Sequence, residues 1–242
     1  MTDFYATNAD IYAAISLPGL PGQLAALRSV VSEPFDGAVV EVAAGVGTAL
    51  STLADMTSDA LYAVEPSTYM RVGLMTTVAG DETLRKRVTI VPGTLSQVGD
   101  RLPERLGGIV VLSALGHFES DELDAFWQFA ARRLLPGGQL VLGLQPPFEP
   151  VEIPWTDFGE TRIGNLSYRT SGTASITSDD LAKWKMRWTV HDADGVELER
   201  REATTQWAVV GPKKVKDAAL AVGLNASGEH LDASMFSFRK PR

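Results

Sequence analysis

Short apolar runs recur along the first 145 residues, separated by stretches with helical periodicity. The five runs lie at 38–43, 61–65, 88–91, 109–115 and 139–144. Val, Ile and Leu follow one another in them almost without polar alternation, which is typical of strands buried on both faces. Because strands alternate with helices, the pattern predicts an α/β fold with a doubly wound, mostly parallel sheet.

The clearest helix is predicted between the fourth and fifth runs. Its apolar positions recur at i, i+3 and i+4 and are Leu123, Phe126, Trp127, Ala130 and Leu134. Ser120 is expected to cap the helix, and two acidic residues after it complement the positive end of the helix dipole. Pro136 and the two glycines that follow are expected to end it.

The pattern changes after residue 145. The segment 145–155, "QPPFEPVEIPW", is rich in proline and unsuited to the interior of a sheet. The segment 183–192 then alternates strictly between apolar and polar residues, as a half-buried antiparallel strand does. A turn at 192–195 leads to a partner strand over 197–210, and 166–176 is expected to pair beside them. A helix over 211–222 and a strand over 233–240 complete the chain, so a small antiparallel sheet is inserted before the last helix.

Composition and charge exclude several classes of function. The 242 residues include no cysteine, which excludes disulfides, cysteine–zinc sites and thiol nucleophiles. The formal charge of −8 argues against a large nucleic-acid interface, which needs a basic face. No apolar run approaches the roughly 20 residues of a membrane helix, and the first ten residues lack the pattern of a signal peptide. We therefore expect a cytoplasmic protein that binds neither nucleic acid nor membrane.

Two glycines follow the first apolar run in the segment 39–48, "VVEVAAGVGT". A dinucleotide-binding turn has the pattern G-x-G-x-x-G, but Ala43 and Thr48 stand at two of its three glycine positions. An acid, Glu41, precedes Gly45 and Gly47 instead. This arrangement resembles motif I of the class I S-adenosylmethionine-dependent methyltransferases, with Ala43 in place of the usual first glycine.

Four further segments match the same family in order and spacing. "LYAVEPS" (61–67) ends its strand on Glu65, where the family uses an acid to accept both ribose hydroxyls. "VPGTL" (91–95) resembles the segment that frames the adenine, although Thr94 replaces a frequent acid, so adenine recognition is expected to rest on backbone and Leu95. "LSALGHF" (112–118) occupies the position beside the transferring methyl, and "LLPGGQLVL" (134–142) resembles the family's start of strand five.

The resemblance covers about residues 37–145. It implies a seven-stranded Rossmann-like methyltransferase sheet with an inserted antiparallel β-lid, and S-adenosyl-L-methionine as the cofactor, without a metal. The implied cofactor-binding residues are Glu41, Ala43, Gly45, Gly47, Glu65, Pro66, Met70, Gly93, Thr94, Leu95, Ser113 and Ala114. The expected organisation is an N-terminal helical cover (1–36), a core (37–146 and 211–242) and the antiparallel insert (147–210).

The layout of the chain is similar to that of the glycine, aminosugar and related small-amine N-methyltransferases. There the N-terminal segment folds over the cofactor and the insert forms a wall of the acceptor pocket. Tyr5 and Tyr12 are therefore candidates to close the site, and Trp155 and Tyr168 are candidates to bind the acceptor. For the tyrosines, the alternative is that they fix an N-terminal helix to the core. Trp184 and Trp188 are expected mainly to form the small core of the insert.

Three functions remain open from the sequence. The first is methyl transfer to an amine of a small molecule or a peptide N-terminus, in secondary metabolism, by a monomer or homodimer. The second is O- or C-methylation with His117 as the base, a residue that equally fits a packing role. The third is a non-catalytic, cofactor-binding partner protein.

Overall fold

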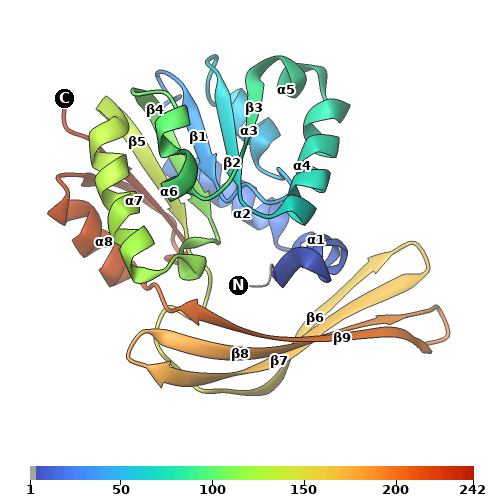
Figure 1. Ribbon diagram of the computed structural model, residues 1–242. Coiled ribbons are helices and arrows are strands. Elements are labelled where there is room, and N and C mark those ends of the chain that lie inside the picture. The colour runs from blue at the N-terminus through green and yellow to red at the C-terminus, as the bar shows by residue number, and fades with distance from the viewer. Residues whose placement is uncertain (1–3) are drawn as a thin grey trace.

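The structure is a computed structural model and describes residues 4–242. A seven-stranded sheet in the order β10-β11-β5-β4-β1-β2-β3 forms its larger layer (Figure 1). These strands are β1 (Val39–Val42), β2 (Leu61–Glu65), β3 (Val88–Pro92), β4 (Leu106–Leu112), β5 (Leu134–Gly143), β10 (Asn225–Glu229) and β11 (Met235–Arg239). Strands β1 to β5 are parallel, and β11 is antiparallel to both neighbours. The predicted doubly wound, mostly parallel sheet is confirmed.

Helices cover both faces of this sheet. The helical elements are η1 (Phe4–Ala6), α1 (Ala9–Ser16), α2 (Leu20–Val30), α3 (Leu50–Asp55), α4 (Thr68–Gly80), α5 (Glu82–Arg87), α6 (Leu95–Val98), η2 (Gly99–Arg101), η3 (Leu115–His117), α7 (Ser120–Arg133) and α8 (Pro212–Ala221). On one face, Leu27 of α2 packs with Val110 and Val141. On the other, Phe126 of α7 packs with Ile109 and Leu140. Successive strand residues thus enter opposite apolar layers, which explains the continuous apolar runs.

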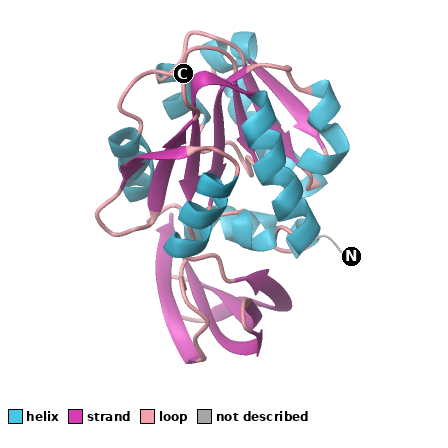
Figure 2. Cartoon of the chain, turned by 90° about the vertical axis from the view of Figure 1, so that its left-hand side faces the viewer, coloured by secondary structure: helices cyan, strands magenta, loops and turns pink. Residues whose placement is uncertain are grey.

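A second sheet lies beyond the carboxyl ends of the core strands, as Figures 1 and 2 show. It comprises β6 (Ile153–Ile163), β7 (Leu166–Ser178), β8 (Leu181–His191) and β9 (Glu197–Ala208), all antiparallel to their neighbours. Trp184, Met186 and Trp188 are buried on its inner face, while Lys183 and Lys185 are exposed on the other. The predicted alternation and the inserted antiparallel sheet are confirmed. Ile11 of α1 packs into the inner face, so this helix lies between the two sheets.

Several boundaries differ from the sequence-based expectation. Strand β6 was not expected, because proline is excluded only from sheet interiors and β6 is an edge strand, paired with β7 alone. Strand β10, also at an edge, is largely polar and exposed, so it has no apolar pattern to detect. The cap of α7 is Glu119 rather than Ser120: the Glu119 amide donates to the Glu122 carboxylate at 3.2 Å. In the described range 4–242, no helix combines the length and apolar character needed to cross a membrane.

Candidate functional site

The carboxyl ends of β1, β2 and β4 meet at one edge of the core sheet, because these strands are parallel and adjacent. The backbone there takes left-handed conformations that side chains disfavour. Ala43 follows β1 at φ +57°, and Ser113 follows β4 at φ +53°. Such strain in non-glycine residues is concentrated at functional sites. Ala43 thus adopts the conformation for which the related motif uses glycine.

Glu65 joins two of these strand ends. Its carboxylate is only 4% exposed, and its two oxygens accept hydrogen bonds from the amides of Gly45 and Ser67, both at 2.8 Å. Carboxylate oxygens accept hydrogen bonds from hydroxyl groups as well as from amides. Glu65 therefore positions the loop after β1 and carries a group whose chemistry suits hydroxyl donors.

Glu41 presents a second buried carboxyl group close to the first. Its Oε2 atom has no hydrogen-bond partner in the described part of the chain. Burial, together with the nearby charge of Glu65, raises the pKa of Glu41 to about 8. An unpaired buried oxygen is costly unless a ligand satisfies it. Two neighbouring carboxyl groups favour a ligand that brings a donor or a positive charge.

The two glycines of the loop after β1 serve different purposes. A Cβ atom on Gly45 would have no neighbour within 4 Å, so this residue borders open space that a ligand can approach closely. A Cβ atom on Gly47 would lie 2.7 Å from the Leu74 side chain and 3.0 Å from that of Leu50. Both glycines have positive φ, at +57° and +82°. Gly45 is thus available to a ligand, whereas Gly47 is required by packing.

The N-terminal segment, here residues 4–16, reaches this site. Burial raises the pKa of the Tyr12 hydroxyl, a hydrogen bond with Tyr5 opposes that shift, and the nearby charge of Glu65 adds to it. The two tyrosine rings meet edge to face with centroids 5.2 Å apart. The structure therefore brings Tyr12 near Glu65 and places Tyr5 against Tyr12. Residues 1–3 of the expected N-terminal cover lie outside the described residues.

Arg201 of β9 fixes the N-terminal segment to the second sheet. Its guanidinium donates to both carboxylate oxygens of Asp10, at 2.6 and 3.0 Å, and to the carbonyl oxygen of Thr7. Glu199 lies on the other side of the same guanidinium, 2.6 Å from its Nε. This contact was not predicted, since the partners are far apart along the chain.

The remaining predicted cofactor-binding residues follow the carboxyl ends of the core strands, and they differ in their exposure to solvent. Met70 and Ala114 are buried, Pro66 is exposed, and Gly93 and Leu95 are half-buried. Thr94 caps α6, its amide donating to Gln97 Oε1 at 3.0 Å. The Ser113 hydroxyl accepts a hydrogen bond from Gln23 of α2 at 2.9 Å. Gln23 was not predicted, because a single glutamine in a helix carries no recognisable pattern.

His117 ends η3 directly after β4. Its ring meets Trp207 of β9 edge to face, with centroids 5.2 Å apart. Part of the residue is exposed to solvent, but neighbouring groups shield the ring. This desolvation lowers the pKa of the His117 imidazole. The imidazole is therefore neutral at pH 7 and has a lone pair available to accept a proton.

The two predicted acceptor residues lie on opposite faces of the second sheet. Tyr168 pairs with Val190 on the inner face and packs into the apolar layer there. Trp155 lies under the guanidinium of Arg187, 4.6 Å from its ring centroid, on the face turned away from Trp184. A bulge between Ile153 and Thr156 places it there. This position does not bring Trp155 together with Tyr168.

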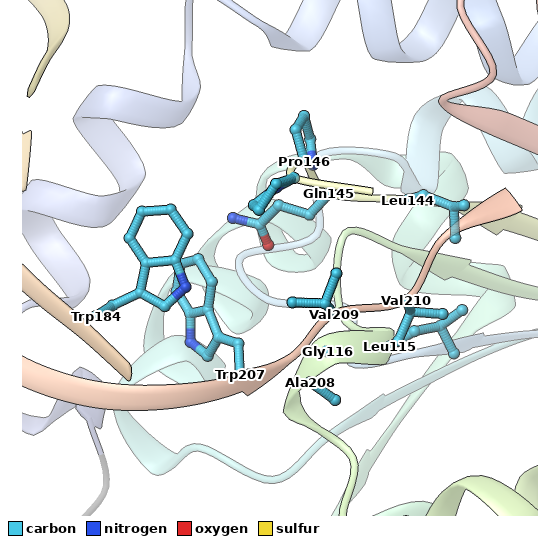
Figure 3. A pocket seen from close by; sticks show the side chains of 11 residues that line it. Leu115, Gly116, Leu144, Gln145, Pro146, Trp184, Trp207, Ala208, Val209 and Val210 are labelled. Atoms are coloured by element: carbon cyan, nitrogen blue, oxygen red, sulfur yellow. The ribbon is translucent and has the colours of Figure 1, made fainter. Parts of the chain in front are cut away.

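A small cavity of about 20 Å³ lies between the second sheet and the segments that follow β4 and β5 (Figure 3). It is lined by Leu115, Gly116, Leu144, Gln145, Pro146, Pro147, Trp184, Trp207, Ala208, Val209 and Val210. Figure 3 shows the two indole rings side by side, with the Gln145 amide directed toward them. The second sheet thus packs against η3, the element that carries His117.

Comparison with known proteins identifies similar folds. No family model matches the chain, and no curated protein matches its sequence. DesVI of Streptomyces venezuelae superposes with a TM-score of 0.75 at 16% identity, over 98% of this chain and 99% of DesVI. CalS10 of Micromonospora echinaspora, an amino pentose methyltransferase solved with bound S-adenosylmethionine, gives 0.71 at 16% identity, over 99% and 98% of the two chains. The sugar N-methyltransferase KedS8 of a Streptoalloteichus species gives 0.71 at 16% identity, over 96% and 92%. The chain shares their fold from end to end.

Proposed function

We propose that this chain is an S-adenosylmethionine-dependent methyltransferase that acts on an amine nitrogen of a small molecule or a peptide N-terminus. The observation that carries the proposal is the arrangement of Glu41, Gly45 and Glu65 at one strand edge. It combines open space beside Gly45, a buried Glu41 oxygen that has no hydrogen-bond partner in the described part of the chain, and a buried carboxylate at the end of the neighbouring strand. CalS10, which has the same fold, is known with S-adenosylmethionine bound.

The residues at this edge fit two parts of that cofactor, the ribose and the methionine. Glu65 accepts hydrogen bonds from the ribose hydroxyls, because the two oxygens of a carboxylate match the two adjacent hydroxyls of a vicinal diol. Glu41 faces the positively charged methionine part, which compensates its unpaired oxygen. Gly45 allows close approach of the backbone. The further binding positions are Ala43, Gly47, Pro66, Met70, Gly93, Thr94, Leu95, Ser113 and Ala114.

When bound, the cofactor supplies a methyl group on a sulfonium that is already an activated leaving group. The lone pair of a neutral amine forms the new N–C bond as the C–S bond breaks, and the resulting ammonium loses its proton to water. The protein's main contribution is alignment of acceptor and methyl group, which can supply about 7–11 kcal/mol. Tyr5 and Tyr12 close the site, and no protein base is required for an amine that arrives neutral.

A second candidate is O- or C-methylation. The observation in its favour is the lowered pKa of His117, which leaves a neutral imidazole after β4. A hydroxyl acceptor needs such a base. A non-catalytic, cofactor-binding partner protein is the third candidate, and it predicts binding without turnover.

We further propose the organisation in which residues 1–36 cover the core (37–146 and 211–242) and the insert (147–210) covers the acceptor. CalS10, which is involved in calicheamicin biosynthesis, also supports a role in secondary metabolism. We propose a cytoplasmic monomer or homodimer that binds no nucleic acid.

Calorimetry and a transfer assay test the proposal together. We expect micromolar affinity for S-adenosylmethionine and its demethylated product, and no affinity for NAD. Incubation with methyl-labelled cofactor and a panel of amines, phenols and peptides should label amines. Binding of NAD without binding of S-adenosylmethionine would refute the family assignment. Labelling of phenols alone would favour the second candidate, and binding with no labelling would favour the third.

A further inference from the structure

Arg71 of α4 bonds to the end of strand β2. Its Nη1 atom donates to the carbonyl oxygens of Glu65 and Pro66, at 2.8 and 2.6 Å. Its Nη2 atom donates to the Thr68 hydroxyl at 2.9 Å. The Glu65 carbonyl oxygen also accepts a hydrogen bond from the Gly93 amide at 3.3 Å, so the end of β2 is joined to the segment after β3. Arg71 therefore fixes the backbone that carries the Glu65 carboxylate.

Thr77, further along the same helix, bonds to the loop after β1. Its hydroxyl donates to the carbonyl oxygen of Val46 at 2.8 Å. The helix also packs closely against this loop, because a Cβ atom on Gly73 would lie 2.7 Å from a methyl carbon of Val46. Val46 directly follows Gly45 in the sequence. Thr77 therefore fixes the backbone next to the glycine that borders open space.

These two contacts complete a closed set of interactions at one side of the proposed cofactor site. The Glu65 carboxylate joins the two strand ends directly, since it accepts a hydrogen bond from the Gly45 amide at 2.8 Å. Arg71 and Thr77 join the same two backbones a second time, through α4, and they lie within two turns of this one helix. The separation between the Glu65 carboxylate and the loop after β1 therefore depends on α4 as well as on the sheet.

We propose that Arg71 and Thr77 are positioning residues for S-adenosylmethionine, which act through the Glu65 carboxylate and through the loop after β1. The inference rests on the proposed methyltransferase function, and it assigns α4 a role that the strand-end pattern does not indicate. In the proposed arrangement, Glu65 holds the ribose and the loop beside Gly45 approaches the methionine part. A site that already has its bound geometry before the ligand arrives loses less entropy on binding. Arg71 and Thr77 thus raise cofactor affinity without touching the reacting atoms.

The first test measures the affinity of Arg71 variants for S-adenosylhomocysteine by calorimetry. We expect Arg71→Ala to weaken binding about tenfold, because hydrogen bonds from a charged group are among the stronger ones, and Arg71→Lys to restore part of the affinity. In the transfer assay, the KM for S-adenosylmethionine should rise while kcat at saturating cofactor stays nearly unchanged.

Arg85→Ala is the matched control for Arg71→Ala. The Arg85 guanidinium also donates to a backbone carbonyl of α4, that of Ala79 at 2.6 Å, but at the opposite end of the helix from Arg71. Equal dissociation constants for Arg71→Ala and Arg85→Ala would overturn the positioning role of Arg71.

Thr77→Val removes a hydroxyl group and changes no charge, so it is a milder second variant. We expect it to weaken binding of S-adenosylhomocysteine about two- to tenfold, the range for one neutral hydrogen bond. Thr76→Val is its matched control, because the Thr76 hydroxyl donates within α4, to the Val72 carbonyl oxygen at 3.0 Å. Equal dissociation constants for these two variants would overturn the role of Thr77.

A double-mutant cycle distinguishes positioning of Glu65 from a general loss of stability. Arg71→Ala should weaken binding much less in a Glu65→Ala background than in the wild type, because the carboxylate that Arg71 positions is already absent. Additive losses would overturn the inference while leaving the proposed function in place. Failure of the wild-type protein to bind S-adenosylhomocysteine would overturn the proposed function and this inference with it, so the two failures are distinguishable.

Discussion

Arg201 and Asp10 form a two-pronged ion pair between β9 and α1, with nitrogen–oxygen distances of 2.6 and 3.0 Å. Helix α1 carries Tyr12, which lies beside Glu65 at the proposed ribose position. The pair therefore links the second sheet to the N-terminal segment that we propose covers the cofactor. Its carboxylate partner is largely exposed, which limits the energy of the pair through solvent screening.

Arg201→Ala should weaken binding of S-adenosylhomocysteine about two- to fivefold. An ion pair of this exposure contributes up to about 1 kcal/mol, and its loss frees the N-terminal segment. Hydrogen exchange should become faster in residues 9–16, and calorimetry gives the dissociation constant. Arg200→Ala is the matched control, because Arg200 pairs with Glu197 on the same strand and touches no part of α1 in the pairs described. Equal effects of the two substitutions would contradict a role for the Arg201–Asp10 pair.

Gly45→Ala and Gly47→Ala should distinguish an effect on cofactor affinity from an effect on the free energy of unfolding. Gly45→Ala places a methyl group in open space at positive φ and should cost about 1–2 kcal/mol of unfolding free energy, while strongly reducing cofactor affinity. Gly47→Ala adds an overlap with Leu74 and Leu50, which costs a further 1–3 kcal/mol or so. Denaturant unfolding and calorimetry measure the two quantities. Gly45→Ala with unchanged affinity would show that the open space is not the ligand site.

Glu65→Ala should weaken cofactor binding by about 1.5–3 kcal/mol, the range for hydrogen bonds to a charged group. The same change removes the acceptor for the Gly45 and Ser67 amides, so we also expect a modest loss of stability. Calorimetry at a temperature well below the unfolding midpoint isolates the binding effect. An unchanged dissociation constant would mean that Glu65 does not hold the ribose.

Cofactor affinity should depend on pH through Glu41. Its carboxyl is protonated in the free protein below a pKa of about 8, and a bound cation favours the charged form, so binding releases a proton. Affinity for S-adenosylhomocysteine should rise between about pH 6 and 8, and Glu41→Gln should flatten that rise. The folded pKa is raised above 4.5, so the stability of the free protein should fall as pH increases from there toward 8. Identical pH profiles in wild type and Glu41→Gln would contradict both statements.

His117→Ala should keep turnover within about tenfold of wild type if the acceptor is an amine. The rate should then rise with pH toward the acceptor's own pKa, because the amine must be neutral to react. A loss of more than about a hundredfold, the lower end for removal of a general base, would move the assignment to O-methylation. The measurement is a pH–rate profile of both proteins with the same acceptor.

Local patterns were sufficient for the core strands and the strand-end acids. Glu41 lies near the end of one buried apolar run and Glu65 ends the next, and parallel strands bring their carboxyl ends together whatever the details of packing. Alternation likewise identified the inner face of β8. These features depend on a few consecutive residues, so the sequence contains them directly.

Contacts between distant segments were not predictable in the same way. Arg201 and Asp10 are 191 positions apart, and nothing near either residue specifies the other. Strand β6 has two bulges, one between Ile153 and Thr156 and one between Asp157 and Gly159. They interrupt the alternation of side chains between the two faces, so Trp155 lies on the outer face and Phe158 on the inner one. A one-residue insertion changes the face of a strand residue, and sequence periodicity does not reveal it.

The burial of Glu65 has a kinetic consequence. If Glu65 holds the ribose as proposed, its 4% exposure and the neighbouring Tyr12 require the N-terminal segment to move before the cofactor enters. Opening of α1 would then limit the rates of cofactor binding and of product release. Salt would screen the Arg201–Asp10 pair and shorten the time for which the N-terminal segment stays closed. Ionic strength would then affect the residence time of the cofactor as well as its affinity. A surface ion pair far from the reacting atoms would thereby affect the rate of turnover.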